Sequence, residues 1–244
     1  MRIVWANVAT QGVVLAATIV QNGGVAAVFA VNLVLAQRVV RAMHPSFGWG
    51  LGFTIFSQFL IFSIPAVIAM NAVSVSVNFF SVDPVQREVT EELLMFGSSW
   101  NLMLAAMPLI WVFLATAKPG PQIENFGVGE FRSKTSLLVF GAITMSVGAG
   151  VRLAISVNGP SFTSPLSGKI VFYMTGFLLE IITVAAYAYF RLDLSFHIPN
   201  GSIGPGAYSK DPDTSEKDRK DIEETKDIEE EPWSYPASMG DNKF

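Results

Sequence analysis

Residues 51–77 read LGFTIFSQFLIFSIPAVIAMNAVSVSV, and none of these side chains carries a charge. A helix needs about 20 predominantly apolar residues to cross the roughly 30 Å hydrocarbon core of a bilayer. Lipid offers the backbone no hydrogen bonds, so such a segment must satisfy its own amide groups as an α-helix. This stretch therefore predicts a transmembrane helix and, with it, a membrane fold.

Four further stretches have a similar composition. They cover residues 13–36, 100–117, 135–157 and 169–192. The sequence thus predicts an all-α transmembrane helix bundle with about five spanning helices, formed by residues 1–194. Pro65 and Pro108 lie inside two of the predicted spans, where each removes a backbone donor and is expected to kink its helix.

A short amphipathic helix is predicted before the third span. Asp83 and Pro84 form a typical helix start, and Val85, Val89, Leu93 and Phe96 follow at helical spacing. Two interpretations remain open: the helix lies on the outer membrane interface, or it packs over the mouth of the bundle.

Charge is distributed unevenly along the chain. Hydrophobic residues make up 51% of the 244 residues and charged residues only 15%, against about one quarter in soluble domains. Residues 1–194 carry ten Lys and Arg against eight Asp and Glu, whereas residues 195–244 carry six against twelve. The second segment is poor in aliphatic residues, which predicts an acidic, disordered tail. Such a tail is either a solvated segment or a docking site for a cytoplasmic protein partner.

The placement of Lys and Arg predicts the orientation of the bundle. The loops on the tail side hold Arg38, Arg41, Lys118, Arg132, Lys134 and Arg191. The opposite side holds only Arg2, Arg87, Lys169 and the helix-end Arg152. The N-terminus is therefore expected outside and the tail in the cytoplasm, in either the plasma membrane or an endomembrane.

Glu180 is the main candidate for a functional residue. It lies near the middle of the fifth predicted span, where a carboxylate usually faces the bundle interior and marks a functional site. Tyr173, Gly176, Thr183 and Tyr187 recur around it at spacings of three and four, which places them on the same helix face.

Arg152 is the expected partner of Glu180. The fourth and fifth spans form an antiparallel hairpin, in which the two residues differ in depth by only about 7–8 Å. The pair is either a ligand or proton site or a structural latch, and Arg152 could instead snorkel to the headgroups. Asn32 is a further polar residue inside a predicted span, where an interhelical hydrogen bond is the simplest role.

No enzyme signature is present. The chain has no cysteine and only His44 and His197, which cannot build a zinc site unaided. It lacks a His-Glu-x-x-His motif, a Walker loop and a serine elbow. The sequence therefore predicts no enzyme, no cofactor and no metal site. The acidic soluble part also argues against a nucleic-acid partner.

Several stretches together resemble a fungal family of multi-pass membrane proteins whose function is not established. The matching segments are Asn32-Leu33, Ala36-Gln37-Arg38, Arg41-Ala42, His44-Pro45, Gly48-Trp49, Phe126-Gly127-x-Gly129, Arg132-x-Lys134, Leu179-Glu180-Ile181, Tyr187, Arg191, Asp193, Phe196, Pro199 and Gly204-Pro205-Gly206. The resemblance implies about seven helices, with a further pair before the present chain. The last hairpin is also faintly similar to fungal lipid-translocating exporters.

The function expected from these features is that of an integral membrane protein that binds, senses or transports a lipid-like or amphipathic ligand. The predicted polar centre of the bundle consists of Arg152, Glu180, Tyr173, Tyr187 and Asn32. Membrane lipids are the predicted partners. The alternative is a membrane scaffold that anchors a cytoplasmic interaction tail.

Overall fold

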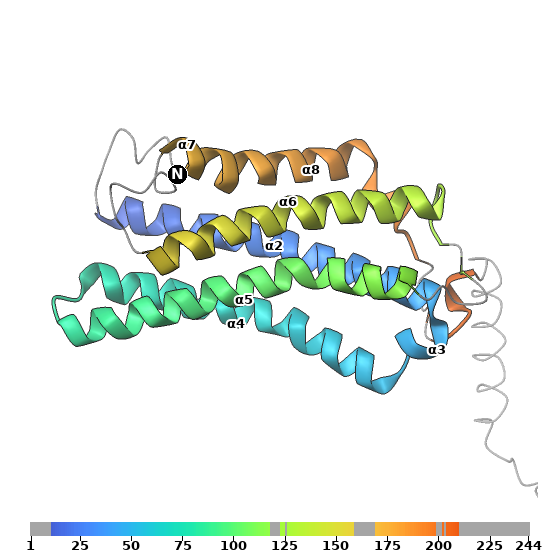
Figure 1. The fold of residues 1–244 in the computed structure, drawn as a ribbon, viewed down its shortest axis with the longest axis horizontal. Coiled ribbons are helices and arrows are strands. Elements are labelled where there is room, and N and C mark those ends of the chain that lie inside the picture. Colours follow the sequence, from blue (N-terminus) through green and yellow to red (C-terminus); the bar gives the residue numbers. More distant parts are fainter. Residues whose placement is uncertain are drawn as a thin grey trace, which may run out of the picture.

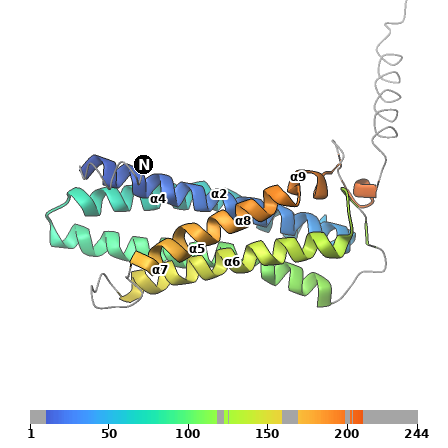
Figure 2. The same cartoon turned by 90° about the horizontal axis from the view of Figure 1, so that it is seen from above.

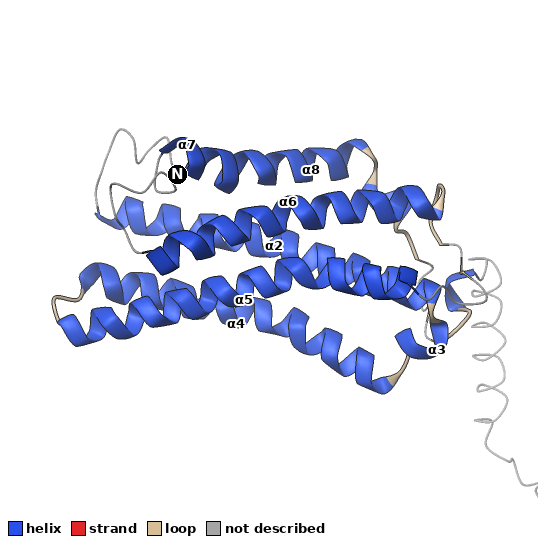
Figure 3. Ribbon diagram, in the orientation of Figure 1, coloured by secondary structure: helices blue, strands red, loops and turns tan. Residues whose placement is uncertain are grey.

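The computed structural model describes residues 11–117, 123–124, 126–158, 169–198, 202 and 204–209. Its elements are α2 (Gln11–Met43), α3 (Pro45–Gly48), α4 (Leu51–Phe80), α5 (Pro84–Ala117), α6 (Phe131–Asn158), α7 (Lys169–Tyr173), the π-helical turn η2 (Met174–Leu178), α8 (Leu179–Tyr189), α9 (Leu192–Ser195) and the 3-10 turn η3 (Ala207–Ser209). Within these ranges there is no strand (Figure 3). The predicted all-α bundle is confirmed.

The long helices lie side by side as an elongated bundle (Figure 1). The central helix α5 packs against α4, α6 and α2. The last helical segment packs mainly on α6. Figure 2 shows α8 running diagonally across the face formed by α2 and α6. The candidate site residues on α2, α6 and α8 therefore lie on three neighbouring helices.

The surface and the interior have the polarity of a membrane protein. Large apolar side chains such as Leu51, Phe62 and Phe113 are exposed, whereas Asn32 and Ser57 are fully buried. Soluble proteins rarely expose apolar surface on this scale, and helices in lipid use polar residues and small residues at their contacts. The chain thus has the architecture of a multi-pass integral membrane protein.

Among the residues that the structure describes, four helices are long and apolar enough to cross a membrane. These spans are Gly23–Met43, Leu51–Phe80, Pro84–Ala117 and Phe131–Asn158. The first lies further along the chain than the predicted 13–36. Of the fifth predicted span, 169–192, residues 169–189 form a continuous helical segment that ends at Tyr189. The turn η2 interrupts its α-helix, and its apolar part is the shorter Met174–Tyr189.

The third predicted span begins earlier than expected. Helix α5 runs without a break from Pro84 to Ala117, so the predicted amphipathic helix and the third span are one element. Asp83 starts it, because its carboxylate accepts the backbone N–H of Val85 at 3.1 Å. The apolar side chains of Val85, Val89 and Phe96 remain exposed, so they do not pack over the bundle mouth.

Two prolines lie inside helices, as the sequence predicts: Pro65 in α4 and Pro108 in α5. Helix α4 bends near its middle and diverges from α5 toward the end that carries α3 (Figure 1). A proline in a helix interior removes one hydrogen bond and commonly has this effect.

The packed part of the chain extends beyond the predicted boundary at residue 194. Phe196 and Tyr208 are both buried in the main hydrophobic core. The boundary of the bundle therefore lies after Tyr208, because two aromatic side chains from the predicted tail fill its end. Residues 210–244, with most of the predicted disordered tail, lie outside the described residues.

Candidate functional site

Arg152 and Glu180 form an ion pair between α6 and α8. The guanidinium Nη2 donates a hydrogen bond to Oε1 of the carboxylate. Their side chains are 28% and 19% exposed, so the pair is largely withdrawn from the surface. Arg152 therefore reaches across the hairpin and does not snorkel to the headgroups.

Tyr187 links α8 to a more distant helix. Its hydroxyl donates a hydrogen bond to Oδ1 of Asn32 on α2, and both residues are buried. Gly141 on α6 makes room for the ring, because a Cβ built at this glycine would collide with the Tyr187 hydroxyl. The Nδ2 amide of Asn32 is buried and has no hydrogen-bond partner among the residues that the structure describes.

A third polar contact lies between these two. The hydroxyls of Thr144 on α6 and Thr183 on α8 are 2.7 Å apart, and Thr183 is fully buried. Glu180, Thr183 and Tyr187 follow one another along one face of α8. We call the three contacts Arg152–Glu180, Thr144–Thr183 and Tyr187–Asn32 the polar seam.

Tyr173 does not join the polar seam, although its spacing predicts that it shares the face of Glu180. Its side chain is 53% exposed. The reason is η2, in which the N–H of Leu179 bonds to the carbonyl of Met174, five residues earlier. A π-turn inserts one extra residue into the helix, which rotates the preceding residues by about 100° relative to those that follow.

An open apolar groove of about 440 Å³ lies beside the polar seam, between α2 and α8. It is lined by Gly24, Val28, Glu180, Ile181, Val184, Ala185 and Ala188. Glu180 is the one ionisable side chain in this lining. Its Oε1 is held by Arg152, and Oε2 accepts no hydrogen bond from any described residue. The groove thus combines a long apolar wall with one available acceptor.

A second polar cluster, which the sequence did not identify as a site, lies at the end of the bundle that carries α3. Arg38 Nη1 donates to the carbonyl of Phe196 at 2.7 Å, and Arg41 Nε donates to that of Gly48 at 3.1 Å. The Arg41 guanidinium also lies 4.3 Å from the ring centre of Trp49. Arg38 therefore joins α2 to a segment that is far away in the chain, whereas Arg41 holds the nearby turn at Gly48 and Trp49.

Glu124 completes this end cluster. Its carboxylate accepts the backbone N–H groups of Gly206 at 2.7 Å and of Tyr208 at 3.3 Å. Burial raises the pKa of the Tyr208 phenol, and a hydrogen bond with Arg41 opposes part of that rise. One sequence signal could have indicated this end cluster. The short motifs at 36–49, 126–134 and 204–206 are far apart in the chain, and the fold brings them to the same end of the bundle.

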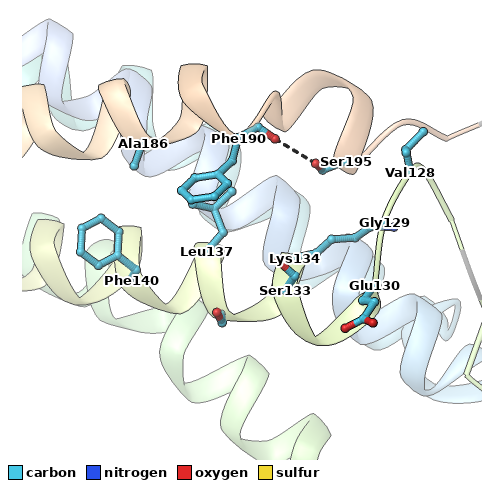
Figure 4. A pocket seen from close by; sticks show the side chains of 11 residues that line it. Val128, Gly129, Glu130, Ser133, Lys134, Leu137, Phe140, Ala186, Phe190 and Ser195 are labelled. Carbon is cyan, nitrogen blue, oxygen red and sulfur yellow. Dashed lines mark hydrogen bonds between the residues drawn. The ribbon is translucent and has the colours of Figure 1, made fainter.

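A pocket of about 370 Å³ lies at the same end, between the start of α6 and the end of α8 (Figure 4). Its lining includes Gly129, Ser133, Lys134, Leu137, Phe140 and Phe190. Lys134 is only 5% exposed, and its ammonium donates to the carbonyl of Phe126. The pocket has a polar rim and an apolar wall.

No family model matches the chain, and comparison with curated proteins and with solved structures finds no similar chain. The resemblance to a fungal membrane family therefore stays a prediction. Among the residues that the structure describes, no three His, Asp or Glu side chains gather in a way that could hold a metal ion.

Proposed function

We propose that this protein binds an amphipathic, hydroxyl-bearing lipid-like ligand in the groove between α2 and α8, as a transporter or a sensor. The observation that carries this proposal is the position of Glu180, an acceptor with one open oxygen in a groove that is otherwise apolar. The volume of about 440 Å³ lies within the usual range for small-molecule sites.

Two physical points support this ligand class. A carboxylate inside a membrane is unfavourable unless it has partners, and a ligand hydroxyl would give Glu180 Oε2 the donor that it lacks. The small side chains of Gly24, Ala185 and Ala188 leave the groove wide enough for a flat or branched apolar body. Glu180 also lies near the middle of the helical segment 169–189, far from the headgroups on either side.

Photo-crosslinking in nanodiscs tests the proposal. The probe is a sterol with a free hydroxyl and a photoactivatable group, and mass spectrometry locates the labelled peptides. Ala185→Phe fills the groove and leaves the Arg152–Glu180 pair in place, so labelling of α2 and α8 should fall several-fold. Val147→Phe places the same side chain at an exposed position on α6 and should leave labelling unchanged. Equal labelling in both variants would contradict the proposal.

The scaffold function is a second candidate, and one observation favours it. In the end cluster, Glu124 holds Gly206 and Tyr208 against the end of the bundle, which fixes the point from which a tail would extend. Deletion of residues 210–244 discriminates between the two functions. If the protein is a scaffold, the truncated chain should no longer bind its cytoplasmic partner. If it is a ligand-binding protein, the truncated chain should still crosslink to the sterol probe.

A further inference from the structure

The pocket at the start of α6 has features that the proposed groove does not explain. Its rim is formed by Ser133, Lys134 and Ser136 from the first turns of α6. The apolar part of its lining is formed by Leu137 and Phe140 further along α6, and by Ala186 and Phe190 at the end of α8. In Figure 4 the side chain of Lys134 runs from α6 toward the loop at Gly129, while the two phenylalanines lie on the other side.

Lys134 is a buried cation that has no acidic partner among the described residues. Within the described residues the ion pairs are Arg152–Glu180 and Arg191–Asp193, and neither includes Lys134. Its ammonium has one carbonyl acceptor and lies 5.0 Å from the ring centre of Phe126. Glu130 also lines the pocket, but it is exposed and forms no ion pair with Lys134. A cation in this position is stabilised by an anion that enters the pocket.

The neighbouring donors suit an oxyanion. The hydroxyls of Ser133 and Ser136 form no hydrogen bond with the residues that the structure describes. The positive end of the α6 dipole lies at the same rim, because the helix begins at Phe131. Ser195 contributes less, since its hydroxyl donates to the carbonyl of Phe190 at 3.1 Å.

The depth of the pocket in the membrane selects the kind of anion. The membrane-spanning helix α6 starts at the rim, so the polar residues lie at the level of the headgroups and the apolar wall extends into the hydrocarbon. A phospholipid has the same division between a phosphate and its chains. We propose that this pocket binds an anionic phospholipid, with its phosphate at Lys134 and a chain along Leu137 and Phe140.

Native mass spectrometry of the full chain tests the proposal. Phosphatidylserine and phosphatidylcholine are titrated separately into the delipidated protein. Phosphatidylserine should bind at least tenfold more tightly, because its headgroup has a net negative charge beside Lys134 whereas that of phosphatidylcholine has none. Lys134→Met keeps the length of the side chain and should remove this preference. Arg132→Met removes an equal charge from an exposed position outside the pocket and should change the affinity less than twofold.

Two further arms keep the test decisive. Ala186→Trp fills the apolar wall without touching Lys134, and it should also abolish tight binding. Inorganic phosphate at millimolar concentration should not displace the lipid, because it lacks the chain. Equal losses in Lys134→Met and Arg132→Met would overturn the proposal, as would displacement by phosphate. Ala185→Phe in the groove should leave phosphatidylserine binding intact, which separates this site from the proposed function.

Discussion

Helices α2 and α8 are held in the bundle by different means. Helix α2 is buried along much of its length, and Phe29, Leu33 and Val39 are almost completely covered by neighbouring helices. Helix α8 buries only Thr183 and Tyr187. Apolar side chains gain little from leaving lipid for protein, so a helix with few packed residues depends on polar contacts. The polar seam supplies them, and α8 is therefore the helix whose position depends on hydrogen bonds.

The largest expected effect comes from breaking the ion pair of the polar seam. Arg152→Ala and Glu180→Ala should each destabilise the bundle by about 2 kcal/mol, below the roughly 3–5 kcal/mol of fully buried pairs. The double variant should lose clearly less than the sum of the two, because the second change removes an unpaired group. Thermal unfolding in detergent measures all three variants. Simple additivity would mean that the pair does not hold α8.

Gly141→Ala should displace α8 sterically. The added methyl group collides with the Tyr187 hydroxyl, which breaks the bond to Asn32 and costs about 1–2 kcal/mol. Gly150→Ala is the matched control on the same helix, since the nearest atom there is Leu102 Cδ1 at 4.0 Å. It should be neutral or slightly stabilising. Equal unfolding temperatures for the two variants would contradict the close contact.

Removal of the hydroxyl contact in the middle of the polar seam should lower the free energy of unfolding by a smaller amount. Thr183→Val keeps the shape of the side chain and loses the contact with Thr144, at about 0.6 kcal/mol. Thr116→Val is the control, because that hydroxyl bonds only to carbonyls of its own helix. Both variants are compared by unfolding in the same detergent, and a larger loss in Thr116→Val would argue against the polar seam.

The smallest effect is expected at the end cluster. There the side chains bond mainly to backbone groups, unlike the side-chain pairs of the polar seam. Burial raises the pKa of Tyr208 in the folded state. The folded protein therefore keeps this proton longer than the unfolded chain, and the contribution of Tyr208 to stability is full below pH about 10 and lost at higher pH. Tyr208→Phe should flatten the alkaline decline in melting temperature above pH 10. An unchanged profile would mean that other groups cause the decline.

The ion pair was predictable from the sequence, whereas much of its surroundings was not. The hairpin between two adjacent spans fixes the relative depth of Arg152 and Glu180. Asn32 lies far from Tyr187 in the chain, and only the packing of α2 against the hairpin brings them together. Tyr173 was misplaced because the π-turn that rotates it leaves no clear pattern in the residues around it.

The end of the bundle was less predictable for another reason. The sequence analysis used the basic residues Arg38, Arg41 and Lys134 only to predict the orientation of the bundle. Their distribution between loops does not indicate which hydrogen-bond acceptors their side chains contact. Tyr208 follows a Gly-Pro-Gly segment and precedes a highly charged stretch, so composition assigned it to the tail. Its burial depends on a pocket made by Trp49 and Phe126, which are distant in the chain.

Helix α5 is longer than a membrane is thick. Its 34 residues extend over about 51 Å, compared with a hydrocarbon core of roughly 30 Å. The charged residues Arg87, Glu88, Glu91 and Glu92 all lie in its first three turns, so the surplus length projects into water at that end. The turn between α4 and α5 is therefore a natural place for an epitope tag. Antibody access to such a tag in intact cells would reveal which side of the membrane this turn faces.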